Sequence, residues 1–273
     1  MHKFIILFLT IFLCGLAKSQ NIFSALQLNT EQEYKTQKPK KIIETSTSFN
    51  SRYKHVNRVI KTFDNAGMLL KEERYDENNI LKTRLTFTND TIHRIKLTRV
   101  LENWMSFGYL KETAIYSYDT NFFLIGIADK DANGVIIRKT NFVCNDKGHP
   151  TELSLFDGNG NSIGKETAVY FYHKNKVVTS IMSNDRKILS SDTIKISSIE
   201  ACKFLALDEI YNTNCDITNW KRHNLNGSKT EIEEEYTYDG FGNCIENKSF
   251  KVTVENGKRK REKERILKKK YFY

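Results

Sequence analysis

Residues 116–172, YSYDTNFFLIGIADKDANGVIIRKTNFVCNDKGHPTELSLFDGNGNSIGKETAVYFY, contain the pattern that decides the fold. Four clusters of turn-forming residues interrupt this stretch, and they begin at Asp119, Asp131, Asn145 and Asp157. Their first residues stand 12, 14 and 12 positions apart. A turn of about four residues followed by a strand of about eight to ten gives this interval. The spacing therefore predicts a series of antiparallel hairpins.

The residues within and between the clusters support the same prediction. Gly134, Gly148 and Gly160 each close a cluster, where a turn usually requires a positive φ that glycine adopts without strain. Between two clusters, Leu153 and Leu155 alternate with polar residues. A period of two residues is typical of a strand with one apolar face.

The interval recurs outside the central stretch. Upstream, Phe63, Tyr75 and Phe87 are spaced 12 residues apart, and the first two are followed by Asp. Downstream, a similar group occupies residues 236–243. Residues 186–230 do not show the interval. We therefore predict hairpins on both sides of one irregular segment.

Residues 238–243, Tyr-Asp-Gly-Phe-Gly-Asn, are the clearest form of the pattern, in which an aromatic–Asp pair ends a strand and Gly-Asn begins the next. On these residues the chain resembles the YD-repeat (RHS-type) family of bacterial secreted and surface proteins, over about residues 55–273 apart from 186–230. Three strand ends depart from the Tyr-Asp pair: Ala128-Asp129, Cys144-Asn145 and Tyr172-His173. The resemblance implies a long, coiled sheet built from hairpins, and it implies no enzyme activity.

The first residues have the pattern of a secretory signal peptide. His2 and Lys3 precede an apolar run over residues 4–15, and small residues follow up to Ser19. The run is shorter than the roughly 20 residues that span a bilayer. We therefore expect cleavage after Ser19 and an exported, periplasmic or extracellular protein with no transmembrane segment after cleavage. Cys14 leaves a lipoprotein open, although the preceding leucine stands where a small residue is expected.

The domain prediction follows from these patterns. Residues 1–19 are the signal peptide, and 20–54 are a poorly ordered lead-in in which Phe23 to Leu28 could form one helical turn. Residues 55–185 are the hairpin repeat region, 186–230 an irregular insertion and 231–273 the C-terminal YD-like hairpin repeats. Within the insertion, residues 188–199 fit two short strands, and residues 199–210 fit either a strand pair or a helix. The predicted fold is all-β: an elongated, coiled antiparallel sheet of tandem hairpins.

One turn cluster also matches half of a calcium loop. Asp129, Asp131 and Asn133 stand at the first three ligand positions of an EF-hand, ahead of Gly134. The twelfth position is Thr140 instead of a bidentate glutamate, and the flanks have strand patterns. We favour a hairpin turn, and calcium remains the one cofactor that the sequence suggests.

Four cysteines follow the predicted signal peptide: Cys144, Cys202, Cys215 and Cys244. An even count in an exported protein is consistent with disulfides. Cys202 and Cys215 are nearest in sequence, and a disulfide between them would contribute about 3 kcal/mol. Buried free thiols are the alternative.

The last predicted strand is densely basic and begins with the run Lys258, Arg259, Lys260 and Arg261. Such a run could bind an anionic polymer. The alternative is a solvated edge strand whose cations pair with the glutamate face of residues 231–235.

Catalytic motifs are not evident in the sequence. The histidines are scattered, and no nucleophile elbow or phosphate-binding glycine loop occurs. We expect an exported non-enzymatic protein that acts as a binding or structural surface for an unknown protein or glycan, and that binds no specific nucleic acid. The alternatives are a carbohydrate-active hydrolase with carboxylates converging across strands, and a calcium-stabilised surface protein.

Overall fold

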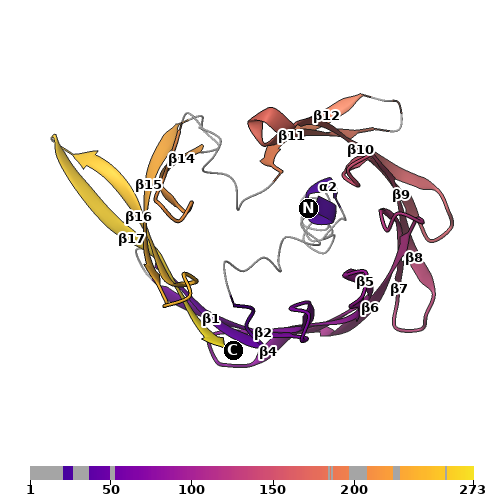
Figure 1. The fold of residues 1–273 in the computed structure, drawn as a ribbon, viewed down its shortest axis with the longest axis horizontal. Coiled ribbons are helices and arrows are strands. Elements are labelled where there is room, and N and C mark those ends of the chain that lie inside the picture. The colour runs from indigo at the N-terminus through magenta and orange to yellow at the C-terminus, as the bar shows by residue number, and fades with distance from the viewer. Residues whose placement is uncertain are drawn as a thin grey trace, which may run out of the picture.

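The protein forms one antiparallel sheet that curves into an open ring (Figure 1). In this computed structural model, the described residues are 21–26, 37–49, 53–183, 185, 187–196, 208–223, 228–255 and 257–273. The seventeen strands are β1 Lys41–Phe49, β2 Lys54–Phe63, β3 Leu69–Tyr75, β4 Leu81–Asp90, β5 Ile95–Met105, β6 Gly108–Tyr118, β7 Leu124–Lys130, β8 Ile136–Cys144, β9 Pro150–Asp157, β10 Ser162–Phe171, β11 Lys176–Met182, β12 Ile188–Lys195, β13 Glu209–Tyr211, β14 Ile217–His223, β15 Lys229–Tyr238, β16 Cys244–Glu255 and β17 Lys258–Phe272. The predicted all-β fold of antiparallel hairpins is confirmed.

Helical structure is sparse among the described residues. It comprises α2, Ile22–Leu26, and one 3-10 turn, η2, Tyr172–Lys174. No helix in the described ranges has the length and apolar character needed to cross a membrane.

The strand order follows the chain except at one point. From β1 to β12 each strand pairs with the next, and so does each strand from β13 to β17. β17 then returns to pair with β1, where Ile42 lies opposite Tyr271. The first and last strands are therefore neighbours in the middle of the sheet, and β12 and β13 are its two ends.

Side chains bridge the opening between these two ends. Lys195, the last residue of β12, donates a hydrogen bond to the Tyr211 hydroxyl of β13 at 2.7 Å and pairs with the Glu209 carboxylate. Burial tends to lower the pKa of Lys195, but its bonds to these two partners raise it overall. An ion pair between side chains therefore connects β12 to β13. Among the described residues, no backbone register joins these two strands.

Eight hairpin turns share one hydrogen-bond pattern. In each, the first residue donates its N–H to the carbonyl of the fifth, and the fourth donates its N–H to the carbonyl of the first. The first residues are Asp64, Asp76, Asp119, Asp131, Asn145, Asp157, Asn212 and Asp239. The four clusters predicted at residues 119, 131, 145 and 157 are all confirmed as turns of this kind.

The side chain of the first residue completes each turn. In the Asp131 turn its Oδ1 accepts the N–H groups of Asn133 and Val135, both at 2.9 Å. The fourth residue has a positive φ in every one of the eight turns. Glycine supplies it at five, whereas Asn79, Phe122 and Cys215 adopt it in the others. The pattern is irregular in sequence because the geometry does not strictly require glycine.

Tyrosines near the strand ends connect neighbouring hairpins. Tyr170 donates its hydroxyl to the carbonyl of Pro150 at 2.6 Å, and Tyr236 does the same to Ile217 at 2.9 Å. Two residues further on, Tyr172 and Tyr238 accept hydrogen bonds from the Asn side chains that begin the turns of adjacent hairpins. At these two places the tyrosines therefore connect one hairpin to the turn beside it.

Two predicted segments differ from the expectation. The lead-in, 20–54, contains α2 on the concave side of the sheet and the central strand β1 (Figure 1). α2 overlaps the helical turn that the sequence allowed around residues 23–28, whereas β1 pairs with β2 and with the distant β17, so a local pattern did not show it. The described part of 186–230 carries β12, β13, β14 and the start of β15, and it continues the sheet instead of interrupting it. Residues 197–207 and 224–227 lie outside the described residues.

We predict that the cap oxygen, more than the residue's charge, stabilises these turns. Asp131→Ala removes the acceptor for two backbone amides and is expected to lower the free energy of unfolding by about 1 to 2 kcal/mol. Asp131→Asn keeps an Oδ1, as Asn145 and Asn212 do in their own turns, and is expected to lose much less. Chemical denaturation of the two variants measures the difference. Equal losses would contradict the role of the oxygen.

Candidate functional site: the concave face around α2

Helix α2 packs inside the curve of the sheet, against β9 and β10 (Figure 1). Its first residue, Ile22, is 0% exposed and belongs to the larger apolar cluster of the molecule. The buried sheet residues of this cluster are Ala114, Tyr116, Leu124, Ile127, Phe142, Leu153, Ala168 and Val177. The concave face of β6 to β11 is therefore the apolar surface on which α2 docks.

The sequence shapes α2 locally through Asn21. Its Oδ1 accepts the Ser24 N–H at 2.7 Å, and its carbonyl accepts the Ala25 N–H at 3.1 Å. An Asn in this position satisfies amides that the first helical turn leaves unpaired. The cap holds Ile22 facing the sheet and leaves Phe23 44% exposed.

A buried carboxylate anchors the start of α2. Oε2 of Glu166, on β10, accepts the Ile22 N–H at 2.7 Å, although the two residues are 144 positions apart. Burial raises the pKa of Glu166, and its hydrogen bonds from Ile22 and Thr179 partly oppose that shift. The sheet therefore holds the segment through one apolar side chain and one backbone group.

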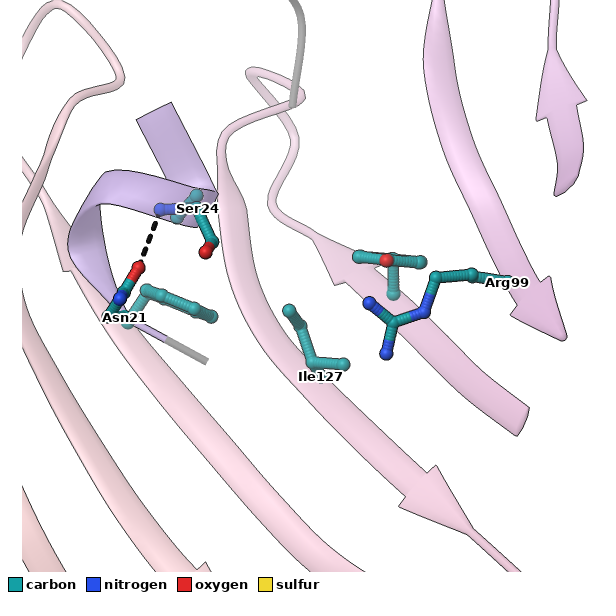
Figure 2. A pocket seen from close by; sticks show the side chains of 7 residues that line it. Asn21, Ser24, Arg99 and Ile127 are labelled. Atoms are coloured by element: carbon teal, nitrogen blue, oxygen red, sulfur yellow. Dashed lines mark hydrogen bonds between the residues drawn. The ribbon is translucent and has the colours of Figure 1, made fainter. Parts of the chain in front are cut away.

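A small pocket lies beside α2, and Figure 2 shows it from close by. Asn21, Ser24 and Ala25 line it from the helix side; Arg99, Tyr116, Ile127 and Phe142 line it from β5, β6, β7 and β8. In Figure 2 the Arg99 side chain extends toward Ile127, across the pocket from α2. The pocket is thus mainly apolar, with one cationic side chain in its wall.

An ion cluster supports this wall. Asp129 is fully buried, and its Oδ2 lies 2.8 Å from Nε of Arg138. Arg99 is a looser partner, with its Nη2 at 3.8 Å from Asp129 Oδ1. Register places the three residues in one row across β5 to β8, through Ala114. A buried carboxylate needs such partners, because an unpaired charge is costly away from water.

Buried polar groups also occur on the concave face of β14 to β17. Glu234 is buried, and it accepts hydrogen bonds from Asn247 at 2.8 Å and from Trp220 Nε1 at 3.4 Å. Close by, Arg222 binds both oxygens of Glu264, at 2.8 and 3.1 Å. Each of these carboxylates has side-chain donors, which is the arrangement expected of structural acceptors.

The predicted calcium residues have other contacts in the structure. Asp129 belongs to the ion cluster, Asp131 caps its turn, and Asn133 donates its N–H to that cap. The described residues contain no group of three or more His, Cys, Asp or Glu side chains that could hold a metal ion. Residues 131–135 form the hairpin turn that the sequence analysis favoured. Calcium binding stays a prediction.

The cysteines divide into two kinds. Cys144 and Cys244 are free thiols. Burial raises the pKa of Cys144, and the negative charge of Asp119 raises it further by a smaller amount. Cys215, the fourth residue of its turn, is disulfide-bonded. Its predicted partner Cys202 lies outside the described residues, so the pairing stays a prediction.

The basic run lies at the start of β17, on a hairpin that projects from the ring (Figure 1). Arg259 lies 2.7 Å from Glu231, and Arg261 lies 2.6 Å from Glu235 on β15. The interpretation that the glutamate face pairs with this run is confirmed for these two arginines. Lys258 and Lys260 are exposed. Polyanion binding by the run stays a prediction.

Sequence reasoning missed the residues that form the pocket. Arg99 occurs in an ordinary alternating strand, and Glu166 is one of 33 acidic residues. Ile22 lies three positions beyond the predicted cleavage site in a segment without a repeat. The one available signal was the short apolar stretch of residues 22–26, which is too brief to indicate a docking partner.

Comparison with known proteins does not assign the chain to a family. No family model matches, and no curated protein matches. Among solved structures, a porin-like protein from Bacteroides uniformis has a TM-score of 0.48 at 12% identity, covering 86% of this chain and 97% of that one. The TcdB2-TccC3 structure has a TM-score of 0.31 at 12% identity, covering 79% of this chain and 15% of that one. A porin-like protein from Bacteroides vulgatus has a TM-score of 0.26 at 9% identity, covering 83% and 97%. Membership of the YD-repeat family stays a prediction.

Glu166 predicts a pH dependence of stability. Because its pKa in the folded protein lies above the ordinary 4.5, the folded state holds this proton more tightly than the unfolded chain. Its contribution to stability is therefore most favourable at low pH and falls as the pH rises from about 4.5 to the raised pKa. Glu166→Gln keeps an acceptor for Ile22 and should gain stability relative to wild type over that window.

Urea denaturation at about pH 4 and about pH 7 measures this difference. Glu152→Gln is the matched control, since Glu152 pairs with Lys165 at 2.7 Å on the opposite face and is part-exposed. A stability difference for Glu166→Gln that does not change with pH would contradict the prediction.

The cysteine arrangement predicts a labelling result. Alkylation of residues 20–273 without reductant should add two labels, on Cys144 and Cys244, because these are the free thiols. Reduction first should raise the count to four. Intact-mass measurement gives the number of labels in both samples. Four labels without reductant would exclude the disulfide.

Proposed function

We propose that this is an exported, non-enzymatic protein of the cell envelope or extracellular space, and that the concave face around α2 binds its partner. The observation that carries the proposal is the docking of α2. A short segment distant in sequence is held there by a buried isoleucine and by a backbone hydrogen bond to Glu166. A surface that holds one apolar segment this way has the chemistry to hold another.

The form of the sheet supports the same proposal. Each hairpin adds area to one continuous surface without closing a deep pocket, which suits a large partner such as a protein or glycan. The larger apolar cluster of the concave face lies on β6 to β11, and further buried polar groups lie on β14 to β17. The two regions offer one partner both apolar contact and hydrogen bonds.

The hydrolase alternative has less support in the described residues. It requires a carboxylic acid with a raised pKa and a second carboxylate across a cleft. On β14 to β17, Glu234 and Glu264 each accept hydrogen bonds from neighbouring side chains. Glu166, the concave carboxyl with a raised pKa, is bonded to the Ile22 N–H at 2.7 Å. These carboxylates are thus held by structural donors, so we propose binding instead of catalysis.

The proposal predicts that capture of a partner depends on the concave face. Immobilised protein is exposed to envelope, polysaccharide and secreted fractions of its producer, in three forms: wild type, Ser24→Arg and Val169→Arg. Ser24 lines the pocket on α2, whereas Val169 is 59% exposed and alternates with the cluster residue Ala168. Both variants add one arginine at an exposed position.

Loss of a captured species with Ser24→Arg, but not with Val169→Arg, is the expected result. Equal capture by all three forms would contradict a concave binding site. Loss with chelator would implicate the Asp129, Asp131 and Asn133 turn. Loss with high salt would implicate the basic run of β17.

A further inference from the structure

The pocket beside α2 has a composition that selects a class of ligand. We propose that it binds a small carboxylate that carries an apolar chain. This inference rests on the proposed function and deepens it, because it names the chemistry that the concave face recognises.

The walls supply the apolar contact. Tyr116, Ile127 and Phe142 belong to the cluster that buries Ile22, and Ala25 packs against the same cluster from the helix. An aliphatic chain among these side chains would be removed from water, which favours binding. The pocket therefore favours an apolar body over a sugar or a free inorganic ion.

Arg99 supplies a charge for the ligand's head group. Arg99 and Arg138 carry two positive charges, and Asp129 carries one negative charge, so the cluster has one positive charge in excess. Asp129 is bound at 2.8 Å by Arg138, whereas its distance to Arg99 is 3.8 Å. Arg138 is therefore the closer partner of Asp129, and the charge of the Arg99 guanidinium is less fully balanced by that carboxylate.

Two buried polar atoms beside the pocket also lack hydrogen bonds. Arg99 Nε and Thr140 Oγ1 have no hydrogen-bond partner among the described residues, and Thr140 is 0% exposed. Thr140 lies opposite the pocket residue Ile127 in the β7–β8 register. A buried donor without an acceptor is unfavourable. A ligand oxygen near the Arg99 guanidinium would remove part of that cost.

The geometry favours a carboxylate over other anions. A guanidinium presents parallel N–H donors that match the two oxygens of a carboxylate. One excess positive charge balances a monoanion, whereas a phosphate would add a second negative charge near the buried Asp129. Glu166, the concave carboxyl group beside α2, already accepts the Ile22 N–H. A monocarboxylate with an apolar chain fits both parts of the pocket.

The experiment is a thermal-shift and calorimetric titration of the full chain with octanoate, with octanol and acetate as the other probes. Octanol keeps the apolar chain without the charge, and acetate keeps the charge without the chain. We expect saturable binding of octanoate that raises the melting temperature, with both other probes at least tenfold weaker.

Three variants test which residues are responsible. Arg99→Gln should weaken octanoate about 10- to 100-fold, because it removes charged hydrogen bonds to the carboxylate. Ala25→Leu, which fills the apolar part and keeps Arg99, should weaken it as well. Arg265→Gln is the control for charge on the sheet, since Arg265 lies on β17 and bonds Asn247 at 3.4 Å. It should leave octanoate binding unchanged.

Two outcomes would overturn the inference. One is equal binding of octanoate and octanol, and the other is equal loss with Arg99→Gln and Arg265→Gln. Either result, together with partner capture that still depends on Ser24, would reject the ligand class and leave the proposed function standing. Octanoate binding as expected, with capture independent of Ser24, would reject partner binding at this face and retain the pocket.

Discussion

Much of the sheet depends on one kind of interaction, the hydrogen bonds from backbone amides to a single side-chain oxygen in eight of the hairpin turns. An Asp or Asn at the first position holds the next four residues in one shape, and the fourth residue takes a positive φ. This geometry sets the register of both flanking strands, because the two ends of the turn are themselves hydrogen-bonded. The fold can therefore extend strand by strand while the rest of each hairpin varies.

Repeating this turn leaves the sheet with two unequal faces. Tyrosines at the strand ends lie on the concave side, and Tyr271 packs there with Ile42, Leu69 and Phe87 in a second apolar cluster. The other face carries ion pairs such as those between the glutamates of β15 and the arginines of β17. Because strands twist with a fixed hand, a sheet of this width curves, and the apolar face becomes the inner one. The inner face is then the place where α2 can be buried.

The concave site combines contacts that differ in how they stabilise the protein. Ile22 stabilises the site by burial of its apolar surface. Glu166 accepts a backbone N–H, but burial of its carboxyl group is itself unfavourable when that group is charged. Asp129 is held by Arg138 and more loosely by Arg99, so the cluster retains a cation toward the pocket. A surface with an apolar majority and one partly buried cation is suited to amphiphilic ligands, which is the basis of the ligand proposal.

The sequence by itself determined the all-β class and the repeating hairpins of residues 55–185 and 231–273, because these depend on residues within about a dozen positions of each other. It did not show β1, and residues 186–230 were expected to be irregular although they carry β12, β13 and β14. It also offered, as one of two interpretations of the basic run, that its cations pair with the glutamates of 231–235, and Arg259 and Arg261 do so. Only the tertiary structure decided which strands meet around the ring, and that β1 lies between β2 and β17. It alone joined Ile22 to Glu166 and Arg99 to Asp129, because such pairs form through the curvature of the complete sheet and leave no periodic trace in the chain.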